Sequence, residues 1–200
     1  TIDDALGEAF DKTAKLLGLG LPGGPRVEAE ARRGDPTRIP LPAPMIGRAA
    51  PDFSFAGLKT AVRQQAQKRV PLGDQDVADL CAAFQAAVAT SVADRVSRAM
   101  AIIAEENLLP AARHLVVAGG VAANMALAER LGEVARRHGY ALCVPPRELC
   151  ADNAAMIAWA GAERLARGLT DPLSVSARAR WPLDAGAAPR LGSGRLGAKA

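Results

Sequence analysis

The sequence predicts an α/β protein, and three patterns point to this class. Residues 110–170 read as strand, helix, strand, helix, which is typical of a right-handed parallel crossover. Apolar residues at helical spacing fill much of residues 4–108. Half of the 200 residues are apolar and 23% are charged, a mix that is typical of globular chains and unlike that of disordered ones.

The first half of the chain is predicted to be helical around a proline-rich loop. Its predicted elements are a helix over 4–18, a tight turn over 22–25, a short helix over 26–33, an extended loop over 34–55, and helices over 58–69 and 77–108. Asp74 or Asp76 is expected to cap the last of these helices, because short acidic side chains accept from the free N–H groups of a helix start. This helix is apolar nearly all round, so we expect it to lie in the core.

The second half contains two short apolar runs that predict buried strands over 114–118 and 140–144, followed by helices over 122–138 and 152–167 respectively. A parallel sheet of only two strands is unusually narrow, because parallel sheets are normally wider and covered on both faces. The chain also begins with Thr1 rather than Met. We therefore expect the chain to be part of a longer protein that supplies the rest of the sheet.

The positive charge of the chain is concentrated in two stretches, and the net charge is +4. Residues 26–69 hold nine Lys or Arg against four acidic residues, and residues 171–200 hold five against two. Such stretches attract polyanions such as RNA, but they are also common on solvated surfaces. Charge alone leaves both interpretations open.

The sequence argues against membrane proteins and against disulfide-built scaffolds. No uncharged apolar run approaches the roughly 20 residues of a membrane span, and no signal peptide is visible, so we expect no membrane association. Cys81, Cys143 and Cys150 are too few and too widely spaced for a disulfide framework or a zinc set. A reducing compartment fits them, and we expect a cytoplasmic protein.

The motif Gly119–Asn124 (GGVAAN) lies between a predicted strand and a predicted helix. Glycines at such a place let a ligand lie directly on the backbone, and the free N–H groups of the helix start attract oxygens or anions. Asn124 offers both a donor and an acceptor, which suits ribose hydroxyls or an amide. The alternative is a tight turn in which Asn124 is an exposed helix residue.

Two further positions, Asp152 and Asp11, have both a functional and a structural interpretation. Asp152 follows the second strand and is expected to face the same crevice as Asn124, where a carboxylate can bind a divalent metal. The residues alone favour the other interpretation, in which Asp152 caps the next helix, because one carboxylate is too few ligands for a metal site. Asp11 is explained by an ion pair with Lys15, or by binding a small-molecule hydroxyl together with the backbone of Gly24.

Five stretches, taken together and in order, resemble one known family. They are DDALGEAFDK over 3–12, PGGP over 22–25, FSFAGLKT over 53–60, GGVAAN over 119–124 and CADNAAMIA over 150–158. The chain resembles the bacterial tRNA N6-adenosine threonylcarbamoyltransferase family, and the likeness runs from residue 1 to about residue 183. The resemblance implies that this chain is a C-terminal fragment of such an enzyme.

The resemblance implies the C-terminal part of an actin-like (ASKHA) ATPase fold with a mostly helical insertion. Residues 1–25 and 110–170 are then part of the second actin-like α/β domain. Residues 26–109 are the helical insertion with its proline-rich loop, and residues 171–200 are a C-terminal extension that is partly disordered.

The resemblance also implies an acyltransferase. Such an enzyme moves the threonylcarbamoyl group from threonylcarbamoyl-AMP to N6 of adenosine 37 in tRNAs that read codons beginning with A. The motif match puts Asp11, Gly24 and Asn124 at adenylate-binding positions and Asp152 at a ligand of a divalent metal, expected to be iron. It assigns no residue of this chain as a general base. The expected partners are tRNA, a related pseudo-enzyme subunit and a small ATPase subunit.

The sequence departs from the family pattern at the metal site. The other two ligands of the family are histidines of an H-x-x-x-H helix upstream of the matching stretches, and this chain has only two histidines, His114 and His138. We therefore expect the 200 residues to be inactive without the missing N-terminal part.

Two other functions stay open at this point. Another actin-like nucleotide-binding protein, such as a sugar kinase or a chaperone, shares the GG-x-x-x-N pattern but does not need FSFAGLKT or Asp152. A non-catalytic partner subunit of the transferase would be expected to lack Asp152.

Overall fold

The computed structural model describes residues 1–108 and 111–176 of the chain. In chain order the elements are α1 (Leu6–Leu16), α2 (Gly23–Ala31), α3 (Ala56–Gln67), α4 (Asp74–Glu105), β1 (His114–Val116), the 3-10 helix η1 (Gly120–Ala123), α5 (Met125–Arg137), β2 (Ala141–Cys143), the 3-10 helix η2 (Arg147–Leu149) and α6 (Ala154–Ala166). They belong to two compact units, residues 1–152 and the residues from 153 onward, which are described separately below.

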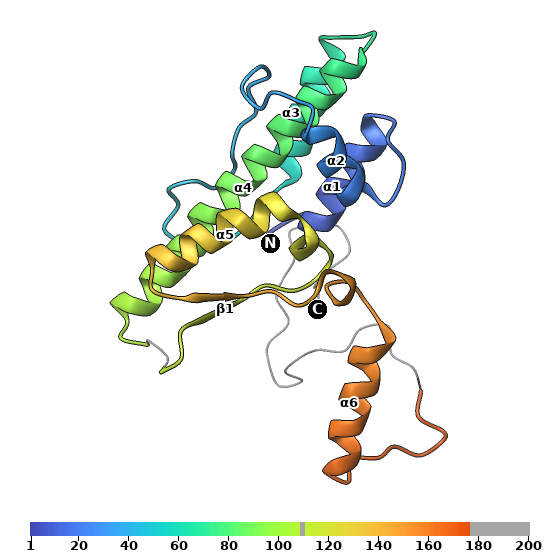
Figure 1. Cartoon of the computed structure of the whole chain (residues 1–200), viewed down its shortest axis with the longest axis vertical. Helices are drawn as coiled ribbons and strands as arrows, with labels where there is room; N and C mark the ends of the chain where they lie inside the picture. Colours follow the sequence, from blue (N-terminus) through green and yellow to red (C-terminus); the bar gives the residue numbers. More distant parts are fainter. Residues whose placement is uncertain (109–110, 177–200) are drawn as a thin grey trace. The chain divides into compact units, whose positions relative to one another are not determined.

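The long helix α4 is the centre of the first unit. Helices α2, α3 and α5 pack against it, and Figure 1 shows α5 running alongside it. Phe84 of α4 is fully buried and meets Phe10 of α1 edge to face, with the ring centroids 5.0 Å apart. Within the described residues α4 is the one helix long and apolar enough to cross a membrane, yet 67% of its apolar window is buried inside the protein. It therefore behaves as the core helix that its sequence predicts.

The start of α4 differs from the prediction. The helix begins at Asp74, and Gly73 rather than either aspartate occupies the N-cap position. Asp76 instead accepts a hydrogen bond from the Gly73 backbone N–H, at 3.2 Å from its Oδ2. The acidic side chain thus still satisfies a backbone donor at the helix start, but from inside the first turn.

The predicted extended loop over 34–55 contains no helix or strand and is held to α4 by polar contacts. The carboxylate of Asp79, which is fully buried on α4, accepts from the backbone N–H of Asp35 at 2.8 Å. The buried guanidinium of Arg95, further along α4, donates to the carbonyl of Arg48 at 2.6 Å. These bonds give a proline-rich segment a fixed path without secondary structure.

Helix α2 begins inside the stretch that the sequence predicts as a turn. Pro22 is its N-cap and Gly23 its first residue, so the helix starts earlier than predicted. Pro25 is tolerated in the first turn because a proline there removes an N–H that has no intrahelical partner. A Cβ at Gly23 would lie 2.6 Å from the Cα of Asp11, so only glycine lets α1 and α2 approach this closely.

Strands β1 and β2 form a parallel pair in which His114 lies opposite Ala141. The chain passes from one to the other through η1 and α5, and α5 packs against β2 and α4, so the predicted strand–helix–strand order is confirmed. The prediction that both strands are buried is wrong. Leu115 and Leu142 pack on the core, whereas Val116 is 68% exposed. One face of this sheet therefore has no cover among the described residues.

The second unit contains α6, which follows the prediction closely. Its N-cap is Asn153, whose side chain accepts from the backbone N–H of Met156 at 3.0 Å. None of the residues of α6 is buried. Residues 177–200, most of the predicted C-terminal extension, lie outside the described residues. The predicted division into residues 1–25 with 110–170, residues 26–109 and residues 171–200 stays a prediction.

Candidate functional site

A cavity of about 380 Å³ opens in the first unit where α1, the start of α2, η1 and η2 come together. Its lining combines apolar side chains and glycines with a few polar groups: Gly7, Phe10, Asp11, Pro22, Gly24, Pro25, Glu28, Gly120, Val121, Ala123, Asn124 and Arg147. Three of these, Asp11, Gly24 and Asn124, are the predicted adenylate-binding residues. The structure thus brings together positions from three separate segments of the chain.

Asp11 reaches the cavity from α1. Its Oδ1 accepts a hydrogen bond from the backbone N–H of Gly23 at 2.7 Å. The predicted ion pair with Lys15 is absent from the ion pairs of residues 1–108, whereas the neighbouring pair of Lys12 with Glu8 forms at 2.6 Å. Because a carboxylate has about four lone-pair sites, Asp11 keeps acceptor capacity for a ligand after this bond.

Gly24 leaves the wall of the cavity open. A Cβ at this position would meet nothing within 4 Å, and the same holds for Gly120. Gly23 and Gly24 therefore have different tasks, although they are adjacent. Gly23 permits the contact between two helices, and Gly24 exposes backbone to the cavity, where a ligand can approach it directly.

Asn124 is buried, with 6% of its surface exposed, so the alternative of an exposed helix residue is wrong. Its Oδ1 accepts from the backbone N–H of Leu127 at 3.0 Å, which makes it the N-cap of α5. Its Nδ2 donates to Oε1 of Gln85 on α4 at 2.9 Å. These two bonds fix the orientation of the amide, and one N–H and one lone pair remain for a ligand.

Glu28 and Arg147 also line the cavity and were missed at the level of the sequence. Glu28 is only 5% exposed, and its Oε1 accepts from the backbone N–H of Met125, the first residue of α5, at 2.9 Å. The expectation that the N–H groups at this helix start are free for a ligand is therefore wrong for Met125 and for Leu127. One signal could have identified Glu28, because it follows Gly24 by one helical turn and so shares its face of α2.

Asp152 does not line this cavity. It is exposed at the end of the first unit, and the alternative that it caps α6 is wrong because Asn153 does so. Residues 1–108 and 111–176 contain no group of three or more His, Cys, Asp or Glu side chains that could hold a metal ion. The described residues therefore do not form a metal centre by themselves, and a crevice shared by Asp152 and Asn124 stays a prediction.

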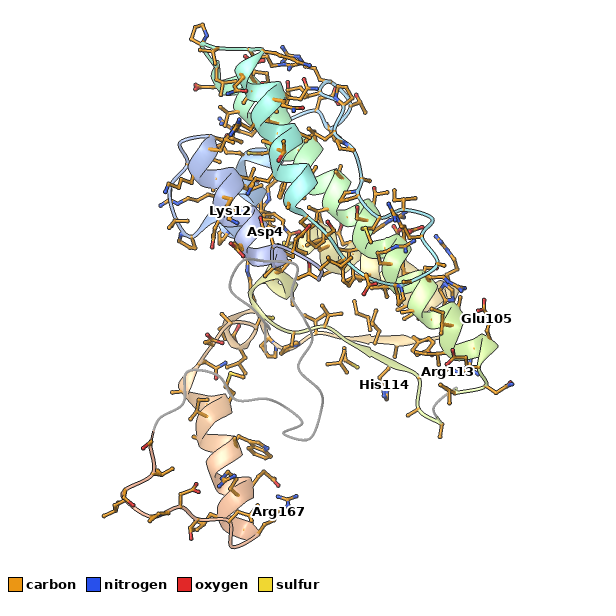
Figure 2. The ribbon with its side chains drawn as sticks, turned by 180° about the vertical axis from the view of Figure 1, so that it is seen from behind. Asp4, Lys12, Glu105, Arg113, His114 and Arg167 are labelled. Carbon is orange, nitrogen blue, oxygen red and sulfur yellow. The ribbon has the colours of Figure 1, made fainter. Side chains whose placement is uncertain are left out.

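A second, shallower groove of about 490 Å³ lies between α1 and α3 and is basic, lined by Lys12, Lys15, Leu16, Lys59, Thr60 and Arg63. Nζ of Lys12 lies 2.9 Å from Oδ1 of Asp4, and Figure 2 labels the two residues next to each other. Hydrogen bonds to Glu8 and to Asp4 raise the pKa of Lys12 above its ordinary value, so its charge persists. Lys15 and Arg63 have no ion-pair partner among the described residues, and their charges face solvent.

Comparison with known proteins places the chain in a family. A sequence model of TsaD, tRNA N6-adenosine threonylcarbamoyltransferase, matches residues 1–159. The chain belongs to the TsaD family. Proteins named tRNA N6-adenosine threonylcarbamoyltransferase from Brucella anthropi and from Brucella ovis are each 60% identical to it over all 200 residues. The resemblance noted in the sequence is thus confirmed.

The TsaD-family relatives are longer than this chain. The 200 residues span 56% of the length of the relatives from Brucella anthropi and Brucella ovis, and they align with the C-terminal part of those proteins. Membership of the family implies an actin-like (ASKHA-type) fold, and a helix-rich structure with one parallel strand pair is compatible with an α/β fold of this kind.

Proposed function

We propose that this chain provides the adenylate-binding side of an acyltransferase. The enzyme would move the threonylcarbamoyl group from threonylcarbamoyl-AMP to N6 of adenosine 37 in tRNAs that read codons beginning with A. The observation that carries the proposal is that Asp11, Gly24 and Asn124 line one cavity. The name of the 60% identical relatives supports a role in tRNA modification.

The composition of the cavity suits an adenylate. Apolar side chains such as Phe10 and Val121 can contact a flat base, as in most small-molecule sites. The open backbone at Gly24 and Gly120 leaves room for the ligand to lie against the wall. Asp11 can accept hydrogen bonds from ribose hydroxyls. In this proposal these residues bind and orient the substrate, and none of them reacts.

Positioning is the main contribution that these residues make to the transfer. The exocyclic amine of adenine is a poor nucleophile, so the reaction depends on a good leaving group, AMP, and on holding the carbonyl within reach of the amine. Fixing two reactants in this way removes much of the entropic part of the barrier. The amide of Asn124 is suited to this task because Leu127 and Gln85 hold it in one orientation. We assign no general base among the described residues.

We also propose Asp152 as one ligand of a divalent metal, iron by the resemblance, in the complete enzyme. A carboxylate oxygen is an appropriate donor for such an ion, and the exposure of Asp152 leaves it accessible to ligands from elsewhere. Such an ion, when bound, would supply Lewis-acid polarisation of the carbonyl. The described residues supply no further group of ligands, so the other ligands would come from outside them. For the same reason we propose that transfer requires residues beyond this chain.

The basic groove between α1 and α3 is our proposed contact for the tRNA backbone. Lys15 and Arg63 are exposed cations without an acidic partner among the described residues, and phosphates are the natural partners of such groups. The groove draws one side from residues 26–69, the first of the two basic stretches. A related pseudo-enzyme subunit and a small ATPase subunit are the proposed protein partners, so RNA binding can be shared.

Filling the cavity tests the adenylate site. Gly24→Val is expected to abolish measurable binding of AMP in calorimetry, because the new side chain projects into open space in the wall. Gly57→Val is the matched control. A Cβ at Gly57 also meets nothing within 4 Å, but this residue lies on α3 and does not line the cavity. Equal AMP affinity in the two variants would count against the proposal.

A tRNA modification assay tests the requirement for further residues. The chain, its partner subunits, threonylcarbamoyl-AMP and unmodified tRNA are expected to give no threonylcarbamoylated adenosine. The same mixture with a complete relative should give it. Full modification by the 200 residues alone would refute this requirement while leaving the family assignment intact.

Salt-dependent tRNA binding tests the groove. Lys15→Ala is expected to weaken binding and to lower the slope of log K against log salt by about one, the change expected on losing one phosphate contact. Lys68→Ala removes an equally exposed charge at the end of α3, outside the groove, and should leave the slope unchanged. Equal effects of the two substitutions would indicate general attraction only.

A further inference from the structure

The ionisable side chains that line the proposed adenylate cavity carry more negative than positive charge. Its lining contains three ionisable side chains, those of Asp11, Glu28 and Arg147. Two of them are acidic, and both lie where a negatively charged ligand would be repelled. Arg147 is the one cationic side chain in the described lining. Among the described lining residues, Arg147 is therefore the side chain that can offset the negative charge of an adenylate phosphate.

The helix start next to the cavity has two of its first N–H groups already in use. The N-terminus of a helix is commonly an anion site because its first N–H groups are unpaired. Here the N–H of Met125 already donates to Glu28, and that of Leu127 donates to Asn124. A carboxylate that is almost completely buried thus occupies the place where a phosphate would otherwise bind at the start of α5.

Arg147 makes one contact with this carboxylate. Its Nη2 lies 3.5 Å from Oε2 of Glu28, whose other oxygen is bonded to Met125. The side chain of Arg147 is 57% exposed, so most of the guanidinium is available. A guanidinium carries five N–H donors in a planar fork that matches two oxygens of a phosphate. One contact to Glu28 leaves donors free for a ligand in the cavity.

We infer that Arg147 is the anion subsite of this cavity and binds the phosphate group of the adenylate, with Glu28 holding the guanidinium at the edge of the cavity. The inference rests on the proposed function and adds to it the residue that distinguishes a nucleotide from a nucleoside. Asp11, Gly24 and Asn124 then contact the nucleoside part, which carries no charge. Arg147 contacts the charged part.

Binding of AMP and of adenosine to the same chain tests this division. The unsubstituted chain is expected to bind AMP more tightly than adenosine. Arg147→Ala should weaken AMP binding by about 10- to 100-fold, the range expected for hydrogen bonds to a charged group, and should leave adenosine binding within about two-fold. Arg147→Lys keeps the charge but loses the planar fork. Its affinity for AMP should therefore lie between that of the unsubstituted chain and that of Arg147→Ala.

Arg32 provides the matched control. Its Nη2 lies 3.8 Å from Oε1 of the same Glu28 and its side chain is 62% exposed, but it does not line the cavity. Arg32→Ala should leave the preference for AMP over adenosine unchanged. An equal loss in Arg32→Ala and Arg147→Ala would overturn the inference, because the effect would then come from general charge around Glu28.

The outcomes separate this inference from the proposed function. If the Arg147→Ala variant binds adenosine and still prefers AMP, Arg147 is not the anion subsite. The proposed adenylate cavity is unaffected by that result. Failure of the unsubstituted chain to bind either AMP or adenosine overturns both. Both arginines are more than half exposed, so the substitutions are expected to leave the thermal unfolding of the chain unchanged, and unfolding curves verify this.

Discussion

Helices α1 and α6 are similar in length and differ in what surrounds them. α1 has 11 residues and buries four of them, whereas α6 has 13 residues and buries none. The difference is not one of composition, since α6 carries Ile157 and Trp159, which are both 71% exposed. Both segments are helical, although only α1 has buried residues. Only packing against other elements gives α1 the fixed position from which it can present a functional side chain.

The predicted adenylate-binding residues and the predicted metal ligand also differ in whether other elements pack around them. Asp11 and Asn124 lie on elements that pack against others in the first unit, and each is held by a hydrogen bond to another element. Asp152 is exposed in the segment that leads to α6 and has no group of co-ligands among the described residues. The packed region therefore gives a cavity with defined geometry, and the segment before α6 gives a single donor.

Truncation of one large aromatic side chain in each region is the strongest test of this contrast. Phe84→Ala is expected to lower the free energy of unfolding by about 3–5 kcal/mol, because it leaves a cavity beside Phe10 in the core. Trp159→Ala should change it by less than about 0.5 kcal/mol, as expected for an exposed position. Urea unfolding measures both. A loss of several kcal/mol in Trp159→Ala would mean that α6 is packed in solution.

A pair of glycine substitutions should have effects of opposite sign. A Cβ at Gly34 would lie 2.0 Å from the carbonyl oxygen of Ala78, so Gly34→Ala forces the loop away from α4 and should cost about 3 kcal/mol. A Cβ at Gly161 meets nothing within 4 Å, and this residue lies inside α6. Gly161→Ala should therefore stabilise α6 by up to about 1 kcal/mol through helix propensity. Unfolding of the chain measures the first effect, and amide exchange within α6 measures the second.

The helices were predictable because their signals are local. Apolar spacing gives α1, α3, α4 and α5 to within a few residues, and the order of strands and helices in residues 110–170 follows from short apolar runs. Helix boundaries were less predictable. Pro22-Gly23-Gly24-Pro25 has the composition of a turn, and its helical start depends on the contact between Gly23 and Asp11, which is not a local property. The exposure of Val116 was missed for the same reason, because an apolar run says nothing about what covers it.

The candidate site was only partly predictable from the residues. Asn124 was predicted from its position between a strand and a helix. Its burial and its hydrogen bond to Gln85 depend on how α4 and α5 pack. Asp11 and Gly24 were selected by the family resemblance, since nothing in their local sequence distinguishes them from surface residues. Arg147 was missed because it comes within reach of Glu28 only in the folded chain.

The buried carboxylate of Asp79 and an exposed carboxylate are expected to contribute differently to the loss of stability in acid. A hydrogen bond from the backbone of Asp35, with further bonds from Gln75 and Arg38, holds the pKa of Asp79 below its ordinary value despite burial. A carboxyl with a lowered pKa in the folded state stabilises the fold above its unfolded pKa, and this stability is lost as the pH falls through the folded pKa. The chain should therefore lose stability below about pH 4.

Asp79→Asn is expected to lower stability at pH 7 and to flatten the fall of unfolding free energy between about pH 4 and pH 2, because the group can no longer take up a proton. Asp171→Asn is the control from the second unit, where Asp171 forms an exposed pair with Arg164. It should change little at either pH, as is usual for surface ion pairs. An unchanged acid slope in Asp79→Asn would assign the acid sensitivity to other carboxyls.

The helix caps Asn124 and Asn153 allow the closest comparison, because each accepts one backbone N–H at 3.0 Å. Asn153→Ala should weaken α6 by about 1 kcal/mol, the usual value of a cap. Asn124→Ala should cost about 2 kcal/mol, since it also leaves the half-buried amide oxygen of Gln85 without its donor. Asn124→Asp retains an acceptor for Leu127 and should recover the cap but not the bond to Gln85. Equal costs for the two alanine variants would mean that the packed environment of Asn124 contributes nothing beyond the cap, and the contrast between the two regions would then reduce to helix propensity.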